Sequence, residues 1–262
     1  MDNRLAEFSQ RKLFYPSVFF IFLLISFLPL ITQKSYSPEN TQQVIIELLK
    51  VSIKPYQALG VLFHVVTIFF AGLVLINSKI SGRLMFAYMG VNFIVIALVQ
   101  SFGITDMYGE VIHTGGFVAF SLLGILWIWA AVKSDAKPLI IKFRWKHILL
   151  IPFAVLAFWS PYQVQADVVL PDFNPFLLLT SPDYGLTFCF TTPVFLFFLF
   201  VIFPKVNIPV YRITAFNGLL YAIFNLAHWF NPATRWMGFL HLPLLVLSIA
   251  ALIQSRKRAV SQ

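Results

Sequence analysis

The chain consists mainly of apolar runs of about 14 to 22 residues. Short charged or proline-rich segments separate these runs. A helix that crosses a bilayer needs about 20 mainly apolar residues, because lipid cannot hydrogen-bond the backbone and a helix satisfies it internally. Only 11% of the 262 residues are charged and 59% are apolar, whereas soluble domains devote about a quarter of their residues to charge. The pattern excludes a soluble fold. It predicts an all-α polytopic membrane helical bundle in which residues 1–262 form a single integral membrane domain.

We expect eight transmembrane helices. Their predicted ranges are 14–31, 57–76, 84–104, 111–132, 147–160, 186–204, 212–229 and 236–254. The fifth run gives the weakest signal, because it is short and contains Pro152. A cleavable signal peptide is the alternative for the first run. That run is longer than the apolar region of a typical signal peptide, however, and no Ala-x-Ala-like site follows it.

The distribution of Lys and Arg tests the eight-span topology independently. With eight spans, 15 of the 19 Lys and Arg residues fall on the side that carries both termini, and five of these lie between Lys133 and Lys146. The other side holds only Lys34, Lys50, Lys54 and Arg235. Because cytoplasmic loops of membrane proteins carry an excess of Lys and Arg, we expect both termini in the cytoplasm of a cell-membrane protein.

The predicted outer side is acidic and contains ordered segments. Seven of the ten Asp and Glu residues fall on this side. One interpretation is that they are solvated loop residues, and the other is that they form a vestibule that attracts cations. Apolar residues recur at helical spacing between Asn40 and Ile53, which predicts an amphipathic helix in the outer interface. The proline-rich segment from Ser160 to Gly185 is expected to be ordered and to lie over the outer surface.

A shift of 128 residues aligns the first four predicted spans with the last four without a gap. Gly90 then falls on Gly218 and His113 on His241. The interpretation is a parallel 4+4 internal repeat with halves 1–132 and 133–262, related by an axis along the membrane normal. Chance matching within an apolar, Phe-rich chain is the alternative.

Histidines gather in the outer halves of the predicted spans. Glu110 precedes His113 by three residues, and Asn225 precedes His228 by three, which places each pair within one turn of a helix. We expect these residues to line one outward-opening ligand site, with Asp106 as an alternative carboxylate. The candidate ligand-binding residues are His64, Glu110, His113, Asn225, His228 and His241. The competing interpretation is that the histidines belong to the belt of polar aromatic side chains at the membrane–water interface and bind no ligand.

The metal candidates within this set are His113, His228 and His241, since imidazole with a carboxylate can hold zinc or a similar divalent cation. The single cysteine, Cys189, lies in an apolar run and is expected to be an inert core thiol. Charged groups are missing from the centres of the predicted spans, so the sequence offers no coupling carboxylate for an ion pump. No metalloprotease, phosphate-loop, dinucleotide or nucleophile-elbow motif is present, and catalytic residues cannot be assigned.

Three function classes therefore remain. The first is an outward-opening binding or transport protein for a small solute or cation, with a divalent metal ion as a candidate cofactor. The alternatives are a membrane-embedded enzyme with a His/carboxylate site at the outer leaflet, and a scaffold or accessory subunit of a membrane complex. Expected partners are the lipid bilayer, a small ligand or cation, and other membrane subunits or copies of the chain. Nucleic acid is not expected, because the net charge of +9 lies in short loops between apolar runs.

Overall fold

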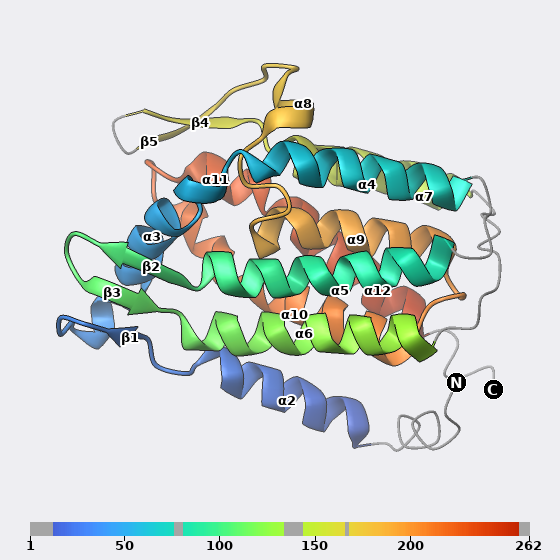
Figure 1. The fold of residues 1–262 in the computed structure, drawn as a ribbon, viewed down its shortest axis with the longest axis horizontal. Coiled ribbons are helices and arrows are strands. Elements are labelled where there is room, and N and C mark those ends of the chain that lie inside the picture. The colour runs from blue at the N-terminus through green and yellow to red at the C-terminus, as the bar shows by residue number, and fades with distance from the viewer. Residues whose placement is uncertain (1–12, 76–80, 134–143, 166–167, 257–262) are drawn as a thin grey trace.

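The computed structural model describes residues 13–75, 81–133, 144–165 and 168–256. The protein is mostly helical, as the sequence predicts. Its longer apolar helices run along the long axis of the molecule (Figure 1). These helices are α2 (Phe14–Ser26), α4 (Leu59–Leu75), α5 (Ser81–Gln100), α6 (Thr114–Lys133), α7 (Trp145–Trp159), α9 (Phe188–Ile202), α10 (Ile208–Asn225) and α12 (Leu242–Arg256).

Three stretches of the described helices are long and apolar enough to cross a membrane: Gly82–Gln100, Thr114–Lys133 and Arg235–Arg256. A fourth candidate is a bent pair of helical stretches, Pro38–Tyr56 and Leu59–Leu73. The chain bends by 78° between them, and the number is four if the pair is counted as one span. Helices α2, α7 and α9 are apolar but shorter.

Small residues allow the helices to approach closely at the centre of the bundle. A Cβ atom added to Gly90 of α5 would lie 2.9 Å from the carbonyl oxygen of Gly124 in α6, so only glycine fits at this crossing. Trp127 of α6 donates a hydrogen bond from Nε1 to Thr214 Oγ1 of α10 over 2.9 Å, and both side chains are buried. Glycine contacts and interhelical hydrogen bonds of this kind are typical of membrane helices.

Short elements form a cap at one end of the bundle, which we call the cap end (Figure 1). A three-stranded sheet in the order β1-β3-β2 is built from Ile31–Thr32, Gly109–Ile112 and Phe102–Thr105. A second hairpin pairs β4 (Tyr162–Gln165) with β5 (Val168–Pro171). The short helices of the cap are η1 (Pro38–Asn40), α3 (Thr41–Ser52), η2 (Lys54–Tyr56), α8 (Leu177–Thr180), η3 (Leu226–Phe230) and α11 (Arg235–Leu240).

The cap confirms one prediction and corrects two. The amphipathic helix predicted between Asn40 and Ile53 is α3, whose apolar residues Val44 and Leu48 are fully buried. The all-α prediction missed the strands. The predicted spans 84–104 and 111–132 ran into β2 and β3, because two apolar strands next to apolar helices cannot be separated from them by hydropathy alone. The first residue of β3, directly after the turn between these strands, is Gly109, whose φ of +68° favours glycine.

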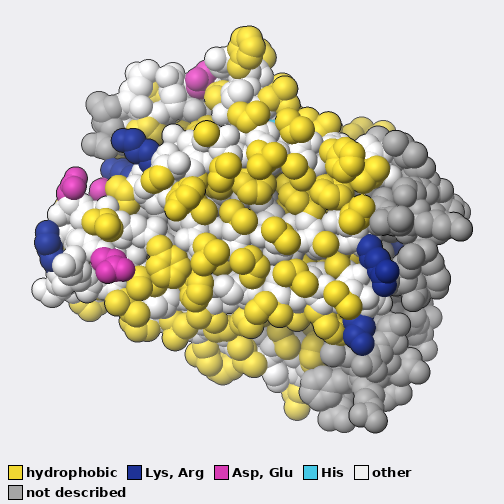
Figure 2. Space-filling view, in the orientation of Figure 1, with side chains coloured by type: hydrophobic (Ala, Val, Ile, Leu, Met, Phe, Trp, Pro, Cys, Tyr) yellow, Lys and Arg dark blue, Asp and Glu magenta, His cyan; other side chains and the backbone are white. Residues whose placement is uncertain are grey.

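Exposed apolar side chains cover the middle of the face shown in Figure 2, whereas Asp and Glu appear only at its cap end. About half of the residues in each candidate membrane-spanning stretch are not buried, although these stretches are apolar. In α4, for example, Val65, Ile68 and Phe69 are 50–59% exposed. A soluble protein rarely exposes contiguous apolar surface of this extent, so the band is suited to contact lipid.

Candidate functional site

The segment from Ser181 to Thr187 enters the helical bundle from the cap end and is buried except for half-buried Pro182. Its polar atoms bind residues of several helices. Asn92 Nδ2 of α5 donates to Gly185 O over 2.9 Å, and Gly185 N donates to Thr191 Oγ1 of α9 over 2.8 Å. This burial corrects the prediction that the whole proline-rich stretch lies over the outer surface. The 181–187 segment therefore connects the cap to the interior of the bundle.

His64 is one of the groups that hold this segment. Its Nδ1 lies 2.7 Å from Gly60 O, and its Nε2 lies 3.0 Å from Phe158 O and 3.1 Å from Ser181 Oγ. The imidazole is fully buried and packs against the rings of Phe158 and Tyr184. All its polar atoms have protein partners, so His64 serves as an internal anchor and does not open to the outside.

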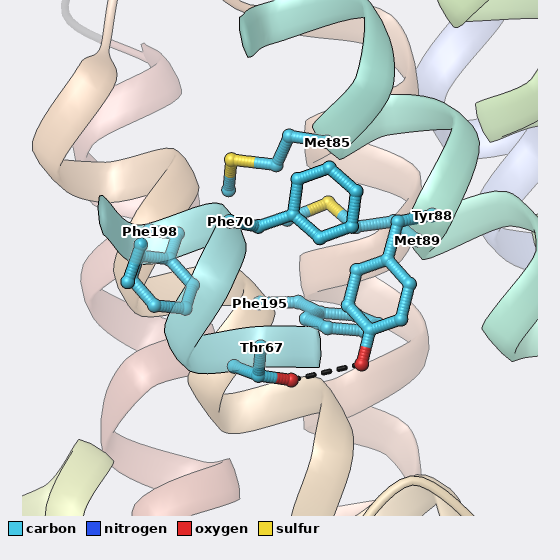
Figure 3. Close-up of a pocket in the computed structure, with 8 residues that line it drawn as sticks. Thr67, Phe70, Met85, Tyr88, Met89, Phe195 and Phe198 are labelled. Carbon is cyan, nitrogen blue, oxygen red and sulfur yellow. Dashed lines mark hydrogen bonds between the residues drawn. The ribbon is translucent and has the colours of Figure 1, made fainter. Parts of the chain in front are cut away.

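A small cavity lies farther along the same network, between α4, α5 and α9. Tyr184 donates to Thr67 Oγ1 over 3.1 Å, and Thr67 Oγ1 is 2.8 Å from Tyr88 OH. Figure 3 shows the Thr67–Tyr88 contact at one side of the cavity, with Phe70, Met85, Met89, Phe195 and Phe198 around the rest. The cavity volume is about 10 Å³, close to the minimum for one water molecule. It is too small for a larger solute.

Asp183 is the one buried carboxylate within the described ranges. It is 6% exposed and accepts a hydrogen bond from the Tyr162 hydroxyl. Burial raises the pKa of Asp183 from 3.8 to about 6, although the hydrogen bond from Tyr162 opposes the shift. Burial, with the nearby Asp183 charge, also raises the pKa of Tyr162 above its usual value, so the phenol keeps its proton. The carboxyl group can therefore bind or release a proton near neutral pH.

Two of the predicted histidines come together beside this pair. The ring of Phe190 lies between Tyr162, with a centroid separation of 6.1 Å, and His241, at 5.9 Å. His241 in turn stacks on His228 at 5.7 Å and an interplanar angle of 21°. We call Tyr162, Asp183, Phe190, His228 and His241 the cap-end cluster. One aromatic ring separates its proton-binding pair from its imidazole pair.

Hydrogen bonds orient both imidazoles. His241 Nδ1 lies 2.7 Å from Met237 O, and because a carbonyl only accepts, Nδ1 carries the proton and Nε2 keeps a lone pair. His228 Nδ1 lies 3.0 Å from Thr234 Oγ1. Within the described part of the chain neither Nε2 has a hydrogen-bond partner. The Nε2 lone pair of His241 is therefore not used by another described residue.

Asn225 continues the polar face inward from His228. Its Nδ2 donates to Tyr221 O over 2.8 Å and lies 3.7 Å from Cys189 Sγ of α9. Polar residues follow at spacings of three or four along this face, which is directed into the bundle. They are Thr214, Asn217, Tyr221, Asn225 and His228, all buried or half-buried. The predicted Asn225–His228 pairing is therefore part of a longer polar face.

Glu110 and His113 do not join the cluster as the sequence suggested. Glu110 is exposed in β3, so the helical turn assumed between it and His113 is wrong; in a strand, residues three apart point to opposite faces. Asp106 is also exposed. Among the described residues, no group of three or more His, Cys, Asp or Glu side chains could hold a metal ion. A metal centre formed jointly by His113, His228 and His241 is thus not assembled.

In comparisons of sequence and structure, the chain matches no known protein family, no curated protein and no solved structure. The geometry of the cap-end cluster is therefore the basis on which a function can be proposed.

Proposed function

We propose that the protein is an eight-span cell-membrane protein that binds or transports a small solute or cation from the outer side, with Asp183 as its proton-binding group. The observation that carries this proposal is the burial of Asp183, which accepts a hydrogen bond from half-buried Tyr162 one aromatic ring away from His241. An ionisable group buried in a membrane protein is costly and usually functional. Asp183 supplies the coupling carboxylate that the predicted spans lacked.

Helix positions support the eight-span topology and the 4+4 repeat. Helices α4, α5 and α6 begin at residues 59, 81 and 114, and α9, α10 and α12 begin at 188, 208 and 242. The differences are 129, 127 and 128 residues, close to the offset found in the sequence. In addition, all described Asp and Glu residues belong to the cap elements and their connections. This agrees with an acidic outer side and a Lys- and Arg-rich cytoplasmic side.

Cysteine labelling checks this topology. We expect Gln163→Cys, an exposed position in β4, to react with a membrane-impermeant maleimide from outside intact cells. Lys137→Cys should react only after the membrane is permeabilised. The native Cys189 is half-buried in α9, and unsubstituted protein measures its background. Labelling of Gln163→Cys from the cytoplasmic side alone would exclude the eight-span topology.

The two other function classes have weaker support in the cluster. An enzyme with a His/carboxylate site would need a carboxylate within reach of an imidazole, whereas Asp183 binds Tyr162 and the ring of Phe190 separates this pair from His241. A scaffold would need no buried ionisable group, because apolar packing is sufficient for that role. A buried carboxyl group with a pKa of about 6, which one aromatic ring separates from an imidazole pair, is best explained by cation or proton binding.

Thermal unfolding in the presence of different cations tests the proposal. Purified protein at pH 7.5 is heated with Na⁺, K⁺, Mg²⁺ or Zn²⁺, and we expect at least one of these to stabilise the wild type. A ligand at 100 times its Kd stabilises by about 2.7 kcal/mol, which corresponds to a rise of several degrees in the unfolding midpoint. Asp183→Asn should lose the effect, since it keeps the shape of the side chain without its charge.

The matched control is Asp106→Asn, which removes an exposed carboxylate of the cap. It should respond to the cation as the wild type does. The proposal fails if no cation stabilises the wild type, or if Asp183→Asn is stabilised equally.

A further inference from the structure

We propose that a groove between α5 and α6, at the end of the bundle opposite the cap, binds one anionic phospholipid of the cytoplasmic leaflet. Arg83 binds the phosphate of the headgroup, and the groove between the two helices receives an acyl chain. This inference goes beyond the proposed cation site. It rests only on the membrane topology included in the proposed function, because the end opposite the cap must face the cytoplasm.

The groove is open to the surface and has a volume of about 380 Å³. This volume falls in the range of about 300–1,000 Å³ that is usual for small-molecule sites. The side chains of Leu84 and Val132, which are 44% and 67% exposed, give the groove an apolar surface. The described lining residues come from the first turns of α5 and the last turn of α6; they are Arg83, Leu84, Ala87, Ala131 and Val132. The groove thus combines one cationic group with apolar side chains.

A contact with α6 holds the guanidinium group of Arg83 at this groove. Its Nη2 donates a hydrogen bond to Val132 O over 3.3 Å. Val132 lies in the last turn of α6, where carbonyl groups have no partner within the helix. The guanidinium therefore lies between the start of α5 and the end of α6. A guanidinium group binds phosphate oxygens in a planar, bidentate geometry, and the exposed Lys133 adds a second positive charge at the end of α6.

The charge at this end of the bundle favours an anionic lipid. The helix ends opposite the cap carry Lys and Arg, among them Arg83, Lys133, Arg144 and Arg256, whereas all described Asp and Glu residues lie in the cap and its connections. Figure 2 shows Lys and Arg side chains at this end of the apolar band. Ends rich in Lys and Arg face the cytoplasm, and anionic lipids give the cytoplasmic leaflet its negative surface potential. Basic pockets between membrane helices on that side bind anionic headgroups.

Exposed apolar side chains continue from the groove toward the middle of the bundle. On α5, Val91 and Leu98 follow Leu84 at intervals of seven residues, and both are 55% exposed. On α6, Ile125 precedes Val132 by seven residues and is 58% exposed. Residues seven apart lie on the same face of a helix. Because α5 and α6 run antiparallel and share the groove, these two rows continue along one seam, over which an acyl chain can lie (Figure 1).

Lipid titration in neutral detergent micelles tests the inference. The full chain is titrated with phosphatidylglycerol or with phosphatidylcholine of the same acyl chains, and native mass spectrometry counts the bound lipids. We expect one phosphatidylglycerol per chain to bind about tenfold or more tightly than phosphatidylcholine. Arg83→Gln should weaken phosphatidylglycerol binding by about 10- to 100-fold, because it removes charge-assisted hydrogen bonds to the phosphate.

Ala87→Trp tests the acyl-chain groove separately, because the indole fills the groove and leaves its charge unchanged. It should weaken phosphatidylglycerol binding by about tenfold or more, since the displacement of two CH₂ groups from an apolar site already costs about this much. Arg256→Gln is the matched control. It removes an exposed positive charge from the same end of the bundle, in the last turn of α12 and outside the groove, and should bind as the wild type does.

Circular dichroism shows which variants are folded, and exposed Arg83 provides the decisive variant if Ala87→Trp does not fold. Equal affinity of the wild type for the two lipids, or wild-type affinity in Arg83→Gln, overturns the site. An equal loss in Arg256→Gln also overturns it, because the effect is then one of overall charge. If a cation stabilises the protein through Asp183 while phosphatidylglycerol is not preferred, this inference fails and the proposed function stands. The reverse result removes the cation site and leaves the lipid site.

Discussion

The folding stability of the wild type relative to Asp183→Asn is expected to fall by about 3 kcal/mol as the pH rises from about 4 to 7. The pKa of Asp183 is about 6 in the folded protein and 3.8 when unperturbed, because burial disfavours its charged form. The difference corresponds to about 3 kcal/mol at 1.36 kcal/mol per pH unit. Between these two values the folded state binds a proton that the unfolded state has released.

The direction of the pH dependence follows from this difference between the folded and the unfolded pKa of Asp183. The stabilisation by Asp183 is fully present below the unfolded pKa and is lost as the pH rises through the folded pKa, so the wild type loses stability relative to Asp183→Asn between pH 4 and 6, and the difference then levels off. Unfolding free energies in detergent micelles at several pH values measure the effect. The amide oxygen of the asparagine variant can still accept the Tyr162 hydrogen bond, so the variant should match or exceed the wild type at pH 7. Asp106→Asn is the control and should keep the pH dependence of the wild type; a stability difference between wild type and Asp183→Asn that does not change with pH contradicts the assignment of Asp183.

Gly185→Ala is expected to destabilise the protein by more than about 4 kcal/mol, or to prevent its folding. Gly185 has a φ of +80°, which L side chains rarely adopt. An added Cβ would also overlap the ring of Phe63 in α4, far inside contact distance. The backbone cannot move away easily, because its N–H and C=O bind Thr191 and Asn92. Backbone strain combined with overpacking at one buried position is among the few causes of so large a loss of folding stability.

Gly72→Ala provides the matched control, since an added Cβ in this part of α4 meets nothing within 4 Å. Alanine there should be neutral or stabilise by up to about 1 kcal/mol through helix propensity. Expression level and thermal unfolding of the two variants give the comparison. If Gly185→Ala unfolds within a few degrees of the wild type, the 181–187 segment is not the rigid connection described above.

The long apolar helices could be predicted from the sequence because long runs of mainly apolar residues favour helices, which satisfy their own backbone hydrogen bonds. All eight predicted runs contain a helix, including the weak fifth run, which forms α7 with Pro152 inside it, but only three of the described stretches, or four with the bent pair, are long and apolar enough to cross a membrane. The cap could not be predicted as well. Strand residues 102–104 and 111–112 are apolar and adjoin helices, so they gave no signal distinct from the predicted spans that contain them.

The candidate site was predicted in part. The spacing of Asn225 and His228 correctly placed both on one helical face, and His228 and His241 lie together. Asp183 was missed because its surroundings, Ser181-Pro182-Asp183-Tyr184-Gly185, have the composition of an exposed turn. Only tertiary contacts with Tyr162 and the surrounding helices bury it. Tyr184 in the same turn was a weak signal, since a large aromatic residue there favours packing against the bundle.

Proton release on cation binding tests the central claim most directly, because that claim links an outer cation site to the proton on Asp183. The measurement is calorimetric titration of the protein at pH 5 with the cation that stabilises it, in two buffers of different ionisation enthalpy. At this pH Asp183 is mostly protonated, and a bound cation favours its ionised form. The wild type should release close to one proton per cation, and Asp183→Asn should release none. Binding without proton release, or equal release by both proteins, would contradict the account.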